Sequence, residues 1–277
     1  MSLMERLGNI DKRVLYVLLI VVVLIPLARP MGLPVSVSHW TLDAFGVIDQ
    51  LKSGDTVIID IDYYVDGAPD VEPILVAVLE HILPKGVKVI FTGIKDHAPM
   101  IADKLMRTWE QRDKKYGVDY VNLGYVAGGE TGLSAYARDL KKAYPRDFKG
   151  NSTDTLPILA KVNGVADIQM FMFFSDGGPD IHTRQISQYK VPIVTGLITV
   201  SAPRAEPFVQ SKQLAGLIIG LRGAAEYETL MKKPGSAIAG MDAQSMGHLL
   251  MILFIIFANL SYFTRRAKDQ AKGGKQA

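Results

Sequence analysis

The chain has 277 residues, of which 48% are hydrophobic and 21% are charged, with a formal net charge of +3. It contains no cysteine, which excludes disulfides, thiol catalysis and cysteine-ligated metal sites. A domain typically holds ~100–200 residues, so this length allows one sizeable domain with additional segments.

The first predicted element is a membrane span. Residues 14–28 carry no charge and follow Lys12 and Arg13 directly. A spanning helix needs ~20 apolar residues, so we extend this segment to residues 14–33, after a tail of residues 1–13. Residues 27–30 include an arginine and a proline where a signal peptidase requires small side chains, which predicts an uncleaved anchor.

The central region, residues 34–235, alternates short apolar runs with longer amphipathic stretches. This pattern predicts an α/β domain with a Rossmann-like sheet of about five mostly parallel strands and helices on both faces. The predicted strands are residues 56–61, 87–92, 118–125, 169–174 and 192–200. The predicted helices are residues 41–52, 71–83, 98–115, 133–143 and 207–232.

A second span with a short extramembrane lead-in is predicted at residues 236–263, its apolar part being residues 246–263, and a basic tail follows at residues 264–277. Basic residues concentrate in the two tails, and loops rich in Lys and Arg stay on the cytoplasmic side. We therefore expect a two-pass protein of the cell membrane, with both termini cytoplasmic and the central domain extracytoplasmic.

Small residues recur at helical spacing where the second span begins, at Ser236, Gly240, Ala243 and Gly247. Such a stripe allows another helix to approach closely, either residues 14–28 of the same chain or a helix of a membrane-protein partner or second copy. The central domain is mildly acidic, so the basic excess indicates attraction to the lipid bilayer rather than nucleic-acid binding.

Polar residues gather where the predicted strands end. Ligands of open parallel sheets bind beyond the carboxyl ends of the strands, so we predict a binding cleft at this edge. The candidate ligand-binding residues are Asp60, Asp62, Thr92, Glu130, Thr131, Asp176 and Thr195. His97 and His182 also follow strand ends, where a surface or capping role is the favoured interpretation.

The order of these residues resembles the motifs of the haloacid dehalogenase superfamily of phosphohydrolases. Asp60 and Asp62 follow an apolar strand, Thr92 ends the second strand, and Asp176 and Asp180 follow a later one. The resemblance implies a nucleophile at Asp60, a general acid or base at Asp62, and Thr92 in the catalytic set. It also implies Mg²⁺ held by Asp60, Asp176 and Asp180.

The chain departs from that family at two motif positions. Tyr64 stands where the family usually has Thr or Val, Ser175 stands where it often has Gly, and the family lysine has no clear counterpart. The alternation of strands and helices also resembles one lobe of a periplasmic sugar-binding protein.

We therefore expect a non-catalytic domain without a cofactor or metal. It would bind a ligand or partner as a scaffold subunit of a membrane assembly. A Mg²⁺-dependent phosphohydrolase is the alternative.

Overall fold

The computed structural model describes residues 11–273, so the outer parts of the two predicted tails, residues 1–10 and 274–277, lie outside the described residues. The chain forms two compact units: Val35–Lys233, and the two ends, Met1–Pro34 with Pro234–Ala277. Each unit is described separately.

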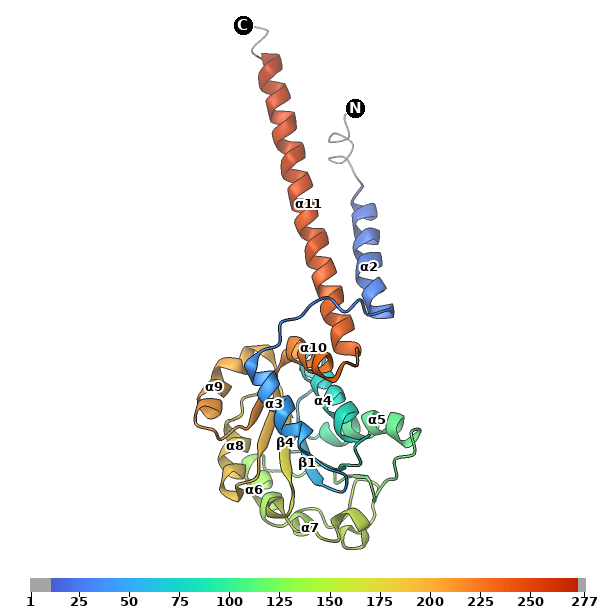
Figure 1. Cartoon of the computed structure of the whole chain (residues 1–277), viewed down its shortest axis with the longest axis vertical. Helices are drawn as coiled ribbons and strands as arrows, with labels where there is room; N and C mark the ends of the chain where they lie inside the picture. Colours follow the sequence, from blue (N-terminus) through green and yellow to red (C-terminus); the bar gives the residue numbers. More distant parts are fainter. Residues whose placement is uncertain (1–10, 274–277) are drawn as a thin grey trace. The chain divides into compact units, whose positions relative to one another are not determined.

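The central unit is built on a six-stranded parallel sheet with the order β3-β2-β1-β4-β5-β6 (Figure 1). The strands are β1 Thr56–Asp62, β2 Lys88–Thr92, β3 Tyr120–Asn122, β4 Met170–Ser175, β5 Ile193–Leu197 and β6 Gly216–Ile219. The strand order reverses between β1 and β4, because the chain first adds β2 and β3 on one side of β1 and then β4 to β6 on the other. The predicted parallel α/β fold is confirmed, with one more strand than expected.

Helices cover both faces of the sheet. They are α3 His39–Asp49, α4 Ala68–Ile82, α5 Ala98–Glu110, α6 Glu130–Arg138, α7 Leu140–Ala143, α8 Asp180–Ile186, α9 Ala202–Gln210 and α10 Gly220–Met231. Short 3₁₀ turns lie in the connections: η1 Thr153–Thr155, η2 Pro157–Leu159, η3 Val165–Asp167, η4 Ser187–Tyr189 and η5 Thr199–Ser201.

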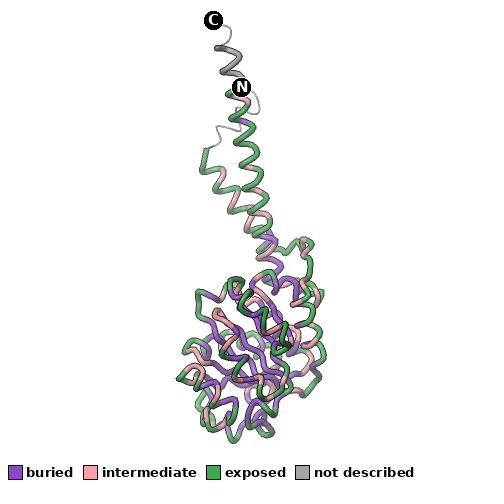
Figure 2. Tube along the Cα trace, turned by 90° about the vertical axis from the view of Figure 1, so that its left-hand side faces the viewer, coloured by how far each residue is buried: buried purple, intermediate pink, exposed green. Residues whose placement is uncertain are grey.

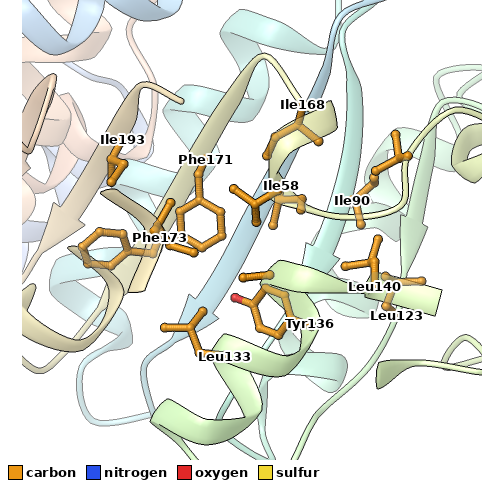
Figure 3. Packing of buried hydrophobic residues seen from close by; sticks show 14 of the residues in the cluster. Ile58, Ile90, Leu123, Leu133, Tyr136, Leu140, Ile168, Phe171, Phe173 and Ile193 are labelled. Carbon is orange, nitrogen blue, oxygen red and sulfur yellow. The ribbon is translucent and has the colours of Figure 1, made fainter. Parts of the chain in front are cut away.

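Alternate residues of the strands face the two helical layers. Phe171 and Phe173 of β4 join a buried cluster with Leu133 and Tyr136 of α6 (Figure 3). The residues that alternate with these face α4. A Cβ added to Gly196 of β5, for example, would lie 2.6 Å from Phe174 and 3.1 Å from Ile74 of α4. Because both faces are covered, the strands read as uninterrupted apolar runs in the sequence.

The predicted helix 207–232 is wrong over its middle part. The helix α9 ends at Gln210, Lys212 takes a left-handed conformation with φ of 58°, and residues Gly216–Ile219 form β6. The pair Ile218 and Ile219 favours a strand. Gly216 lets α3 pack directly on this strand, because a Cβ at position 216 would lie 2.4 Å from the Cα of Ala44.

Two other helices also differ from expectation. The predicted helix 133–143 is interrupted at Asp139, whose backbone is extended and whose carboxylate caps α7 through the N–H of Lys142. The helix α8 was not predicted, because its seven residues are too few to display a periodic apolar pattern.

The terminal unit consists of α2 Lys12–Ala28 and α11 Ser236–Gly273, which lie side by side (Figures 1 and 2). Within the described residues, only Ser236–Thr264 of α11 is long and apolar enough to cross a membrane. The predicted first span, residues 14–33, is helical only over residues 14–28, within the 17-residue helix α2. It ends at Ala28 because Pro30 disfavours a helical conformation at Arg29, which is extended. The structure thus supports one of the two predicted spans.

Asp242 of α11 fixes the segment that follows α2. Its buried carboxylate accepts backbone N–H groups from Met31, Gly32 and Leu33 at 2.6, 2.8 and 3.0 Å. One turn further along, a Cβ added to Gly247 would lie 3.7 Å from Val23 of α2. At Gly247 the small-residue stripe therefore faces the helix of its own chain, one of the two contacts that the sequence suggested.

Candidate functional site

A pocket of about 540 Å³ opens at the carboxyl edge of the sheet, near the reversal between β1 and β4. Its walls come from the loops after β1, β2, β4 and β5 and from the first turn of α4. They consist of Tyr64, Asp66, Gly67, Pro69, Asp70, Lys95, Asp176, Ile198 and Val200. In doubly wound sheets the ligand crevice lies at this reversal, because the adjoining loops leave the sheet in opposite directions.

Lys95 forms the polar floor of the pocket. Its ammonium group bonds to the carboxylate of Asp176, donates to the backbone oxygen of Asp62 at 3.0 Å, and lies 3.6 Å from the Asp62 carboxylate. It also lies 4.5 Å from the centre of the Tyr64 ring. With 19% of its side chain exposed, Lys95 is held rigidly and its positive charge is already balanced.

The loop after β1 is pressed against Asp176. The backbone N–H of Tyr64 donates to Asp176 at 2.7 Å, and a Cβ added to Gly67 would lie 2.5 Å from the Cβ of Asp176. A glycine at position 67 thus permits the approach that closes this wall. On the rim, Asp70 accepts from the N–H of Thr199 at 3.3 Å, and Asp66 is exposed.

The strand register explains the surroundings of Asp62. Asp62 lies opposite Ser175 on β4, and the Ser175 hydroxyl donates to its carboxylate at 2.7 Å. Burial raises the pKa of Asp62, and the Ser175 hydrogen bond and the Lys95 charge partly offset that effect. The pair of Asp62 and Ser175 therefore supports Lys95 from behind the pocket.

Asp60 lies deeper on the same strand and is fully buried. It lies opposite Thr92, whose hydroxyl donates to it at 2.9 Å, and the Tyr136 hydroxyl donates at 2.5 Å. His182 Nε2 lies 3.1 Å away, and its ring stacks on Phe173. Figure 3 shows Tyr136 reaching over the sheet from α6. These three contacts give the buried carboxyl group of Asp60 its hydrogen-bond partners.

The remaining candidates lie elsewhere. Thr195 is buried in β5 and donates to the backbone oxygen of Phe173 at 3.0 Å. Glu130 forms a two-bond pair with Arg184 at 2.8 and 2.7 Å, which lowers the pKa of Glu130 to about 2. Thr131 is exposed on α6.

Of the seven candidate ligand-binding residues, the structure brings Asp176 into the pocket wall and Asp62 behind it. The others lie in the core or on α6. Sequence reasoning missed most of the lining, above all Lys95, Asp66 and Asp70. The feature of the sequence that could have identified these residues is the polar character of the loops after the first two strands.

The three carboxylates considered for Mg²⁺ have separate partners. Asp60 meets His182, Asp176 meets Lys95, and Asp180 accepts from Arg204 at 2.6 Å. Across residues 11–273, no group of three or more acidic or histidine side chains is arranged to hold a metal ion.

A smaller pocket of about 290 Å³ lies at the start of α10. Its buried acid, Glu226, accepts hydrogen bonds from Ser38, Thr41 and Arg222 at 2.7, 2.8 and 3.0 Å. We place the candidate site in the larger pocket because it lies at the strand reversal and leaves the carboxylate of Asp66 exposed on its rim.

Comparison with known proteins gives little further guidance. No family model and no curated protein sequence matches the chain. A solved structure described as the crystal structure of AibC is similar over 79% of this chain and 54% of that chain, with 10% identity and a TM-score of 0.34. A likeness at this level supports no argument about function, and this chain spans only about half of that protein.

Proposed function

We propose that this protein is a membrane-anchored, non-catalytic binding subunit whose α/β domain captures a ligand or partner in the strand-reversal pocket. The observation that carries the proposal is a pocket of about 540 Å³ whose floor, Lys95, is fixed by two carboxylates. A rigid, preorganised wall favours binding because little side-chain freedom is lost when the pocket fills.

The test is ligand-dependent stabilisation of the full-length protein in detergent, measured as a shift in unfolding temperature against a panel of amines, sugars, peptides and nucleotides. A ligand at a hundred times its Kd stabilises the native state by about 2.7 kcal/mol. We expect Val200→Trp, which adds bulk to the pocket wall, to abolish that shift and Val118→Trp, at an exposed valine before β3, to preserve it. A shift equal in both variants would contradict the proposal.

The phosphohydrolase alternative has less support. A nucleophilic carboxylate must reach the phosphorus atom, whereas Asp60 has no exposed surface and three hydrogen-bonding neighbours. Turnover of p-nitrophenyl phosphate with Mg²⁺ by the wild type, lost in Asp60→Asn while the fold is retained, would restore this alternative.

We also propose that α2 crosses the membrane beside α11, with both termini cytoplasmic and the α/β domain outside. Seventeen helical residues span roughly 26 Å, slightly less than a bilayer core, a mismatch that local thinning accommodates. Supporting features are the exposed apolar side chains along α2, Lys12 at its start, and the tie from Asp242 to the following segment.

The absence of cysteine makes this topology simple to test. Single cysteines are introduced at Ser2, Ala135 and Gln276 and labelled on intact cells with a membrane-impermeant maleimide. We expect labelling of Ala135→Cys only. Labelling of either terminal cysteine before lysis would show that α2 and α11 do not both cross in the proposed direction.

A further inference from the structure

The pocket carries an excess of negative charge. Three carboxylates line it, from Asp66, Asp70 and Asp176, against the single ammonium group of Lys95. That ammonium group is already engaged by Asp176 and Asp62. A ligand that enters therefore meets the carboxylates of Asp66 and Asp70, which form no ion pair with a cationic side chain within the described residues and which repel anions and attract cations.

The carboxylates of Asp66 and Asp70 lie at the position where related folds bind phosphate. In nucleotide-binding members of this architecture, pyrophosphate sits at the N-terminus of the helix after the first strand, on a glycine-rich loop. Here that helix is α4, and Asp66 and Asp70 flank its N-cap, Gly67. Asp70 already complements the positive helix end, so a nucleotide or phosphate finds no free positive partner.

Exposed apolar side chains lie in the wall of this acidic pocket and next to it in the chain. Val200 is 80% exposed, Val65 is 71% exposed and Tyr64 is 40% exposed. Tyr64 and Val200 belong to the pocket wall itself, and Val65 is the chain neighbour of Tyr64 and Asp66. A small polar ligand would leave these apolar side chains exposed to water. Aromatic and aliphatic side chains around a charged centre are typical of protein interfaces.

We propose that the pocket receives a Lys or Arg side chain of a protein partner, whose flanking apolar residues cover Tyr64, Val65 and Val200. The inference rests on the proposed binding function and specifies its partner. The negative charge of the pocket favours a cationic side chain. The exposed apolar side chains beside it favour a polypeptide over a free amine, because a polypeptide can cover them.

The test uses the full-length protein in lipid nanodiscs and a phage-displayed library of random twelve-residue peptides. We expect enriched sequences to carry Lys or Arg next to apolar residues, with binding that weakens as salt rises. Enrichment of acidic or uncharged sequences would overturn the inference, and so would sequences whose binding is insensitive to the pocket variants.

An enriched peptide is then measured against two matched pairs of variants. Asp66→Asn is expected to weaken binding about three-fold, while Asp154→Asn, which removes an exposed carboxylate outside the pocket, leaves it unchanged. Val65→Ser is expected to weaken binding about ten-fold, while Val118→Ser, before β3, has no effect. Replacing the peptide's Arg by citrulline should remove the effect of Asp66→Asn.

Binding of agmatine and of inorganic phosphate distinguishes a small-amine site and an anion site from a site for a protein partner. If agmatine binds as tightly as the peptides and ignores Val65→Ser, the occupant is a small amine and the partner inference fails. If phosphate binds in a Lys95-dependent manner, the charge argument fails although the pocket remains a binding site. If no probe binds, the inference fails together with the proposed function.

Discussion

Asp60 and Asp62 stand two residues apart on the same face of β1, a separation of about 6.6 Å along a strand, yet they have different roles. Asp60 is covered by α6 and α8, whereas Asp62 reaches the pocket edge and holds Lys95. The sequence predicts polar residues at this strand end but not which of them is covered. Coverage depends on Tyr136 and His182, which lie 76 and 122 residues further along the chain.

The Tyr136 hydroxyl should be needed for stability. Tyr136→Phe removes a hydrogen-bond donor from the buried carboxyl group of Asp60 and leaves that polar group less well satisfied. We expect a loss of about 1–3 kcal/mol in the free energy of unfolding, measured by denaturant titration of the purified full chain. Tyr125→Phe, at an exposed tyrosine, serves as the control and should change the free energy of unfolding by less than about 0.5 kcal/mol.

His81 should make the domain sensitive to acid. Burial between Asp49 and Tyr227 lowers the pKa of His81 below its ordinary value of 6.5, despite the hydrogen bond to Asp49. The folded state therefore binds this proton less readily than the unfolded state. The stability that His81 contributes is complete above pH 6.5 and is lost as the pH falls below it.

The matching measurement follows the unfolding temperature between pH 7.5 and pH 5. The decline should be shallower in His81→Gln than in the wild type. His97→Gln, at the exposed histidine of the α5 N-cap, should follow the wild type. Parallel curves for His81→Gln and the wild type would contradict the prediction.

At the scale of elements, β1, β2 and β4 can be predicted from the sequence to within one residue, because strands buried on both faces appear as continuous apolar runs. The strand β6 cannot, because its four residues lie between helical segments and contain Gly216 at the start of a helix-like spacing of small residues. The role of Gly216 is contact with Ala44 of α3, which depends on how the sheet is assembled.

Gly216, at this contact, and Gly46, which faces open space on α3, should respond in opposite ways to the same substitution. Gly216→Ala places a Cβ 2.4 Å from a backbone atom of Ala44 and should cost about 1–3 kcal/mol. Gly46→Ala, inside α3 with open space around it, should stabilise the protein by about 1 kcal/mol through helix propensity. Denaturant unfolding of both variants tests the contact, and a stabilising Gly216→Ala would contradict it.

At the scale of the whole molecule, the sequence predicts the fold class and the edge of the sheet that holds the candidate site. It predicts only part of the pocket, because the lining combines four loops that converge once the strand order is set. The terminal unit behaves similarly: the apolar runs are visible in the sequence, but the bond from Asp242 to the segment after α2 is not.

The packing of α2 against α11 predicts an efficient cross-link. The double variant Val23→Cys with Gly247→Cys should form an intramolecular disulfide under mild oxidation, seen as a mobility shift in gels that reducing agent reverses. The pair Val23→Cys with Ile255→Cys, two helical turns further along α11, should not cross-link. Equal yields for both pairs would show that the two helices have no fixed contact.

The sheet tapers from its middle outward. The central strands β1 and β4 have seven and six residues, whereas the edge strands β3 and β6 have three and four. Short edges expose few unpaired backbone groups to an incoming chain. The proposed anchoring to a bilayer would concentrate copies in two dimensions, where open sheet edges can pair between molecules and aggregate. This domain should therefore tolerate high surface density and strong overproduction without cross-β association.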